Sequence, residues 1–290
     1  DFRAHRTQNG SAMGHGEKYM TRPANLASST SSRFGAAFFR GIAGLAGALV
    51  LWEIFARSGL FSVALTPPLG AVVAKLTEMI SAGMIFGHTL VTMARVLIGL
   101  AVAFVIAVPL GIWMGNSRTV EKIISPTLSV LMPIPSLAWV PLFVLWFGIG
   151  NFSTILVVIY ASIFTMIFNT WTGVRAINQI WYKSAVVMGA NSRQMLFKVM
   201  LPGTMPYIIS GLRISFGRAW IAVIGGELLA SPDWGLGKII FDAREFLDTE
   251  SMLSALVFIG LIGIGIEKLF LKRLEKVTIE RWGMSQSQSS

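Results

Sequence analysis

The residues best placed to do chemistry in this sequence are ionisable groups inside apolar runs. Arg213, Arg218 and Glu227 fall within the apolar stretch from Pro206 to Ala230. A charged side chain in an apolar medium is costly, so such groups face a protein interior or a water-filled cavity and often mark a solute path. Two interpretations stay open. The arginines attract an anion in such a path, or Arg218 pairs with Glu227 or with another helix to stabilise a bundle while Arg213 lies near the inner interface.

Catalytic chemistry has little to draw on. An embedded enzyme needs a nucleophile with a base, or clustered carboxylates and histidines, and the chain has three His, two of them in its polar first segment. It has no cysteine, which excludes disulfides and thiolate metal sites. It also lacks the G-x-x-x-x-G-K-[ST] loop that cradles nucleotide phosphates. We therefore expect no enzyme and no bound cofactor, and any ATP must be hydrolysed by a partner subunit.

The composition indicates the elements that must position these residues. The chain is 54% apolar and 13% charged, whereas soluble domains carry about 25% charged residues. About 20 apolar residues cross a bilayer as a helix. The predicted fold is an all-α integral membrane protein with six transmembrane helices, at residues 36–56, 96–117, 127–147, 152–172, 206–230 and 251–270.

The placement of Lys and Arg orients these helices. Seventeen of the 24 basic residues fall in the end segments and in the loops at 116–125 and 174–205, against four in the opposite loops. Cytoplasmic loops carry the excess of basic residues, so both termini are predicted to be cytoplasmic. We expect a disordered tail at 1–35, a transmembrane domain at 36–275 and a cytosolic tail at 276–290. The basic flanks can contact anionic lipid, so the net charge of +10 does not imply nucleic acid.

The third predicted helix should be broken. It contains Pro133, Pro135 and Pro141, and proline removes an amide donor and crowds the preceding turn. A broken helix survives in lipid only where neighbouring helices or a water-filled cavity satisfy its freed backbone groups. We expect the break at Pro133 and Pro135 to shape a translocation path.

Charged residues near the outer side receive simpler interpretations. Arg95, at the start of the second helix, is predicted to anchor at the membrane interface, and His88 to be solvated. The loop between the last two helices carries acids that form either a solvated face or a docking surface for a binding protein, with the solvated face favoured: Asp242, Glu245, Asp248 and Glu250.

The loop at 174–205 contains two short helical patterns. The first pattern predicts a helix with one apolar face, formed by Ile180, Ser184, Val187 and Met188. Gly189 should end this helix. In the second pattern, Ser192 is predicted to act as the cap and Leu201-Pro202 as the end, with its apolar face formed by Met195, Leu196, Val199 and Met200. Such a pair suits docking into another protein's groove. An amphipathic linker lying on the membrane is the alternative.

This loop resembles the signature (EAA) loop of bacterial ABC importer permeases. Ser184 and Ala185 match its small pair, Gly189 its glycine and Leu201-Pro202 its end, whereas Lys183 stands where the family usually has Glu. The resemblance implies that the loop couples to an ATPase. The residues assigned to coupling are Lys183, Ser184, Ala185, Met188, Gly189, Ala190, Leu201 and Pro202.

The resemblance covers roughly residues 67–282. Within the family, the chain is similar to the branch that includes nitrate, sulfonate, taurine and bicarbonate permeases. The motifs that carry this similarity include Pro133-Ile134-Pro135 and Leu145-Trp146-Phe147-Gly148-Ile149-Gly150. It implies a type I importer fold in the bacterial inner membrane. Two permease copies would pair with two ATPases, which bind ATP and Mg²⁺, and a periplasmic or lipid-anchored binding protein would deliver the solute. The path residues would be Pro133, Pro135, Arg213, Arg218 and Glu227.

Two alternatives remain for the function. One is a secondary transporter driven by an ion gradient, although such folds often show internal repeats and no convincing repeat is visible. The other is a permease of the same family for a neutral solute, because the sequence does not name its cargo. Co-purification with an ATPase, and uptake that depends on it, would separate the ATP-driven importer from the ion-coupled transporter.

Overall fold

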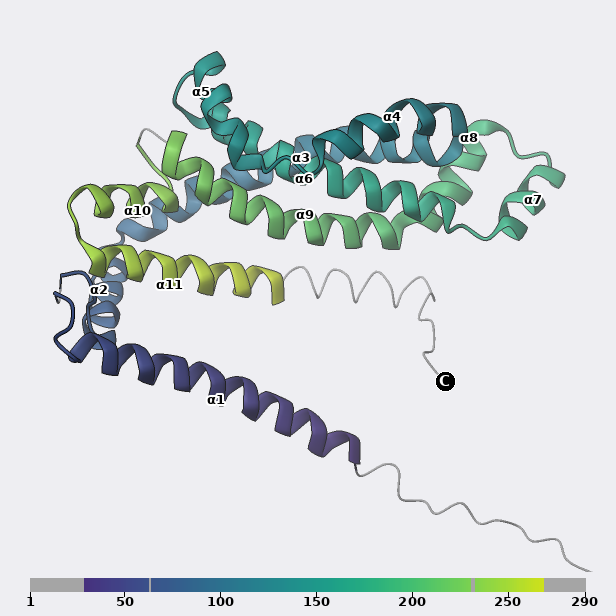
Figure 1. Cartoon of the computed structure of the whole chain (residues 1–290). Helices are drawn as coiled ribbons and strands as arrows, with labels where there is room; N and C mark the ends of the chain where they lie inside the picture. The colour runs from purple at the N-terminus through teal and green to yellow at the C-terminus, as the bar shows by residue number, and fades with distance from the viewer. Residues whose placement is uncertain (1–28, 63, 231–232, 269–290) are drawn as a thin grey trace, which may run out of the picture. The chain divides into compact units, whose positions relative to one another are not determined.

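The computed structural model describes residues 29–62, 64–230 and 233–268, and every regular element in these ranges is helical (Figure 1). The chain divides into two units, residues 1–52 and 53–290. Helix α1, Ser29–Arg57, falls mostly in the first unit. Residues 1–28 of the predicted tail at 1–35, and the whole of the predicted tail at 276–290, lie outside the described residues.

Three long helices form the centre of the second unit: α3 (Met84–Asn116), α6 (Asn151–Arg175) and α9 (Leu201–Ala230) (Figure 1). Small residues let them approach closely, as is common between membrane helices. A Cβ added at Gly99 would lie 2.6 Å from Val158, and one at Gly173 would lie 2.5 Å from Tyr207. Helices α3 and α6, and helices α6 and α9, therefore approach closely at a glycine.

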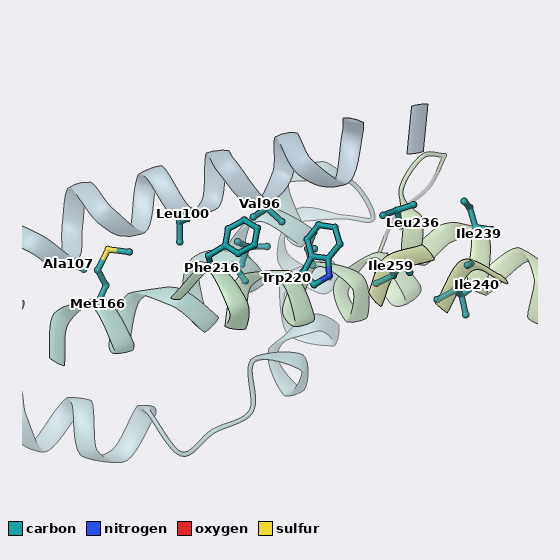
Figure 2. Packing of buried hydrophobic residues seen from close by; sticks show 14 of the residues in the cluster. Val96, Leu100, Ala107, Met166, Phe216, Trp220, Leu236, Ile239, Ile240 and Ile259 are labelled. Atoms are coloured by element: carbon teal, nitrogen blue, oxygen red, sulfur yellow. The ribbon is translucent and has the colours of Figure 1, made fainter. Parts of the chain in front are cut away.

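The main apolar core runs along these helices. Figure 2 shows Val96 and Leu100 of α3 facing Phe216 and Trp220 of α9. The core continues into α10 (Leu236–Glu245) and α11 (Thr249–Ile266), where Leu236, Ile239, Ile240 and Ile259 pack together. Helix α2, Leu69–Ser81, packs on α11, and its first amide donates to Glu53 Oε2 over 2.8 Å.

Within the described ranges, four helical segments are long and apolar enough to cross a membrane: α3, α6, the continuous helix Ser192–Ala230, and α11. A bent pair adds a fifth crossing if it counts as one span. The sequence predicted six, and α1 is not among the four. The predicted second span also began too late, at Val96, because α3 starts at Met84 and carries Arg95 inside it.

The bent pair confirms the predicted break in the third helix. Helix α4 (Arg118–Leu131) and the segment Ser136–Phe147, which comprises η1 (Ser136–Trp139) and α5 (Val140–Phe147), meet at 85°. Pro133 and Pro135 lie in the break, and Pro141 lies in the first turn of α5. The Tyr160 hydroxyl of α6 donates to the Leu131 carbonyl over 2.7 Å. A neighbouring helix thus satisfies one carbonyl at the break.

Candidate functional site

The exposed loop at one end of α9 centres on helix α7, Gln179–Val187. Asn178 caps its start by accepting from the Ile180 amide at 2.9 Å. Gly189, with φ +74°, ends it in the left-handed conformation that suits glycine. The Gly189 amide donates to Val186 and the Ala190 amide to Ala185, each over 3.0 Å, a pattern known as the Schellman motif. The helix end predicted from Gly189 is confirmed.

Apolar side chains of α7 and its end stand in solvent. Val187 is 87% exposed and Met188 is 85% exposed, and Ile180 is exposed as well. A Cβ built at Gly189 would meet no atom within 4 Å. The opposite side is anchored, because Ala185 packs on the small cluster of Val174, Met195 and Met200. The loop therefore presents an exposed apolar surface at the end of α7, while Ala185 on the other side of the helix is packed against the rest of the chain.

The other residues assigned to coupling divide by exposure. Lys183 and Ser184 are exposed beside Met188 and Gly189, whereas Ala190 is half-buried. Leu201 and Pro202 are also half-buried and belong to the start of α9. Six of the eight residues therefore lie on α7 and its end, and the final pair lies on the next helix.

Two details of the second short helix differ from the prediction. Its cap is Asn191, not Ser192: Asn191 Oδ1 accepts from the Gln194 amide at 2.8 Å while Gln194 Oε1 accepts from the Asn191 amide at 2.9 Å. This reciprocal capping box needs Gln at its third position. With Asn191 as the cap, Gln194 falls at that third position.

Pro202 does not end the helix. A continuous helix runs from Ser192 through α8 (Ser192–Gln194), η2 (Met195–Met200) and α9 to Ala230. In η2, a π-helix, the Leu201 amide donates to the Leu196 carbonyl, five residues earlier. This widened turn accommodates Pro202 without the clash a proline makes in a regular α-helix.

A buried polar cluster lies at the opposite end of α9 and is centred on Arg95 and Glu227. Arg95 is 4% exposed and Glu227 is 1% exposed, and Arg95 Nη1 donates to Glu227 Oε1 over 2.7 Å. The Thr92 hydroxyl and the Gly237 amide also donate to Glu227, over 2.8 and 2.9 Å. We call these groups, with Asn151 and the Trp234 carbonyl, the Arg95–Glu227 cluster.

The remaining donors of Arg95 are used as well. Its Nε and Nη2 donate to Asn151 Oδ1 over 2.8 and 2.6 Å, and its Nη1 donates to the Trp234 carbonyl over 2.7 Å. A Cβ at Gly235 would lie 2.5 Å from Glu227 Cδ, so the loop before α10 rests directly on the pair. The cluster joins α3, α6, α9 and the α9–α10 loop through one pair of charges.

Two sequence-based predictions at this end, for Arg95 and His88, are wrong, and the pairing of Arg218 with Glu227, one of the open alternatives, is not found. Arg95 is no interfacial anchor, because its partners bury it. Glu227 does not pair with Arg218, because it faces Arg95 instead. His88 is half-buried, and its Nδ1 lies 2.8 Å from the Gly235 carbonyl oxygen and its ring 4.8 Å from the Trp234 ring.

The cluster also contains residues that the sequence analysis missed. Thr92 and Asn151 take part in it but were not proposed. A usable signal existed for one of them: His88, Thr92 and Arg95 follow helical spacing and share one face of α3. Asn151, from another helix, offered no such local signal.

The proposed path residues separate into three places. Pro133, Pro135 and Arg218 line one cavity of about 250 Å³. Arg213 lines another cavity and pairs with Glu267, Nη2 to Oε1, over 3.3 Å. Glu227 belongs to the Arg95–Glu227 cluster. The structure therefore brings together three of the five.

The acids near α10 have local partners. Asp242 pairs with Lys238 and Glu245 pairs with Arg244. Asp248 caps α11 by accepting from the Ser251 amide and hydroxyl over 3.0 and 2.6 Å. Burial raises the pKa of Asp248, but the Ser251 hydrogen bonds outweigh it and hold the pKa below its usual value. These roles are compatible with the solvated face.

Comparison with known proteins identifies the family. Residues 107–276 match the model of the binding-protein-dependent transport system inner membrane component. The chain is 34% identical over 237 residues to the taurine transport system permease TauC of Escherichia coli, covering 80% of this chain and 86% of TauC. It is 30% identical over 237 residues to the bicarbonate transport system permease CmpB of Synechococcus elongatus, covering 78% and 84%.

The fold is also found among solved structures. An inward-facing structure of the MetNI methionine ABC transporter superposes with a TM-score of 0.59 at 18% identity, covering 67% of this chain and 95% of the matched chain. That likeness shows the fold alone, which this chain shares with the matched transporter chain. The family match and the curated relatives show that the chain belongs to the ABC transporter permeases, as a binding-protein-dependent transport system inner membrane component.

Proposed function

We propose that this permease couples to a separate ATPase through α7 and Gly189 and carries a small oxyanion such as a sulfonate, taurine, bicarbonate or nitrate. The observation that carries the coupling proposal is the exposed apolar end of α7 on its anchored base. Val187 and Met188 are almost fully exposed, although water offers no stabilising contact to apolar side chains. A hydrophobic groove on a partner would cover them.

The proposed cargo follows from the solutes for which the relatives are named and from the negative charge of those solutes. TauC is named for taurine and CmpB for bicarbonate, and both solutes carry an anionic oxygen-rich group. In this proposal two copies of the chain form six crossings each, with both termini in the cytoplasm. Two ATPase subunits bind ATP and Mg²⁺, and a binding protein delivers the solute from the other side of the bacterial inner membrane.

Substitutions at Gly189 test the coupling proposal and separate its two requirements. Asn tolerates the left-handed conformation, so Gly189→Asn keeps the helix end and adds a modest side chain, whereas Gly189→Trp adds a bulky one. Both substitutions carry the strain of the positive φ, but the surroundings of Gly189 are open within the chain. An effect of side-chain size beyond that strain therefore points to a partner surface. We expect Gly189→Trp to insert into the membrane but to lose ATPase co-purification and uptake.

Gly189→Asn is expected to retain part of the ATPase co-purification and part of the uptake. Normal uptake and normal ATPase retention by Gly189→Trp would contradict docking at this residue. Uptake that persists without any ATPase and depends on an ion gradient would instead support the secondary transporter.

A further inference from the structure

Arg218 occupies an unusual position in α9. The helix has 30 residues, and at 1.5 Å per residue Arg218 lies about 25 Å from its start and about 18 Å from its end. Its side chain is exposed on the bundle surface. Arginine side chains near a helix end can snorkel to the membrane interface, but Arg218 is far from both ends of α9.

The other two charges of α9 have opposite charges beside them. Glu227 is buried against Arg95, and Arg213 pairs with Glu267. Arg218 forms no ion pair with any acidic side chain in the described residues 40–62, 64–230 and 233–268. An unneutralised guanidinium facing hydrocarbon costs several kcal/mol. This face of α9 therefore meets water or an anion.

A cavity lies beside Arg218. Its volume is about 250 Å³, which corresponds to roughly eight water molecules at about 30 Å³ each. It is lined from the break between α4 and η1, from α6 and from α9, by Met132, Pro133, Ile134, Pro135, Ser136, Tyr160, Ala161, Phe164, Arg218 and Ile221. Among the described residues that line it, Arg218 alone is charged. A small anion with a few waters fits the space and the charge.

The break supplies the polar part of this lining. Because Pro133 and Pro135 interrupt the helix, the backbone around them turns by 85° beside α6 instead of packing along it. Ser136 is part of the lining there, and a serine hydroxyl can donate to an anion. Tyr160 and Phe164 provide aromatic walls, which suit the apolar part of an organic anion.

We propose that this cavity, with Arg218 and Ser136, is a binding site for a small oxyanion within the translocation path. Arg218 supplies the charge, and its planar fork matches two oxygens of a sulfonate, carboxylate or nitrate group. The proposal rests on the transport function above and names the site where charge selectivity arises. The residue expected to carry selectivity is Arg218 and not Arg213, whose charge Glu267 compensates.

The absence of cysteine from the sequence allows a direct test. A single Ser136→Cys substitution places a thiol in the cavity lining, in the full chain reconstituted in lipid nanodiscs. Its reaction rates are measured with an anionic methanethiosulfonate that carries a sulfonate group and with a cationic one that carries a trimethylammonium group. Clefts lined by one charge raise the local concentration of the opposite ion at least about tenfold. We expect the anionic reagent to be favoured by about that factor.

Two comparisons assign the preference to Arg218. Adding Arg218→Gln should remove most of the preference, and adding Arg218→Lys should keep it. Ser210→Cys is the matched control, because Ser210 lines the cavity beside the Arg213–Glu267 pair, where the charges cancel and no preference is expected. Methanesulfonate should slow the anionic reagent at Ser136→Cys and not at Ser210→Cys.

Each other outcome overturns the proposal. An unchanged preference in Arg218→Gln would mean that the charge acts elsewhere. Failure of both reagents to reach Ser136→Cys would mean that another protein surface fills the cavity. The labelling needs no ATP, so it is independent of the Gly189 experiment. A normal labelling pattern together with uptake that needs no ATPase would contradict the coupling mechanism and leave the anion site supported.

Discussion

Removing the negative charge at Glu227 should release α10 from the bundle. Glu227→Gln keeps the shape of the side chain but leaves the Arg95 guanidinium buried without a counter-charge. Breaking a buried ion pair on one side costs about 3–5 kcal/mol. Since 1.36 kcal/mol is a factor of ten, local opening of the α9–α10 loop should become more frequent by about two to almost four powers of ten.

Thiol labelling measures this opening in a chain without cysteine. Ala243 of α10 is buried, so Ala243→Cys reacts only when α10 separates from its neighbours, and its rate reports the opening equilibrium. Phe246→Cys is the control, because Phe246 is exposed already and should react at one rate in every background. We expect Glu227→Gln to accelerate labelling at residue 243 alone.

The double variant distinguishes a charge effect from a general loss of packing. Arg95→Gln together with Glu227→Gln removes both charges, so no uncompensated ion stays buried. It should open α10 less often than Glu227→Gln alone, despite carrying more changes. An unchanged labelling rate in Glu227→Gln would refute the claim that the Arg95–Glu227 cluster holds α10 against the bundle. A double variant whose effect equals the sum of the two single effects would refute it as well.

Two further predictions concern single hydrogen-bonded groups. Tyr160→Phe removes the donor to the Leu131 carbonyl at the helix break and should lower the free energy of unfolding by about 0.5–1.5 kcal/mol, seen as a lower melting temperature; an unchanged melting temperature would mean that water replaces the hydroxyl. Because the folded pKa of Asp248 is depressed by Ser251, its stabilisation is present above its unfolded pKa of about 3.9 and is lost as the pH falls through the lower folded pKa. The melting temperatures of the native chain and Asp248→Asn should therefore differ by a constant amount above about pH 4 and converge below it, and parallel curves throughout would contradict the cap.

The parts of the fold that sequence predicts best are those encoded locally. Pro133 and Pro135 remove amide donors within a few residues of each other, and the break follows. Gly189 accepts a positive φ, and the end of α7 follows. The apolar lengths predict α3, α6, α9 and α11, although the predicted ends are displaced by up to a dozen residues where a charge such as Arg95 lies inside a helix.

The parts that sequence could not predict depend on partners distant along the chain. From the sequence alone, Arg95 resembles an interfacial anchor. Its partners Asn151 and Glu227 are each more than 50 positions away along the chain. The π-helix before Pro202 is similar, because Met195 and Met200 at its two ends are buried in a cluster with Val174, which belongs to another helix. A local pattern carries no information on such contacts.

The geometry of α9 explains why its three charges serve three separate purposes. At 3.6 residues per turn each residue advances about 100°, so Arg218 and Glu227, nine positions apart, point in opposite directions. Arg213 and Glu227 lie within about 40° of each other in projection, but about 21 Å apart along the axis, and each finds its partner on another helix. A helix that buries Glu227 against α3 must turn Arg218 outward on the other side. An arginine on that outer face, near the middle of α9 and beside a broken helix, requires an aqueous or anionic neighbour, and a solute path for anions provides one.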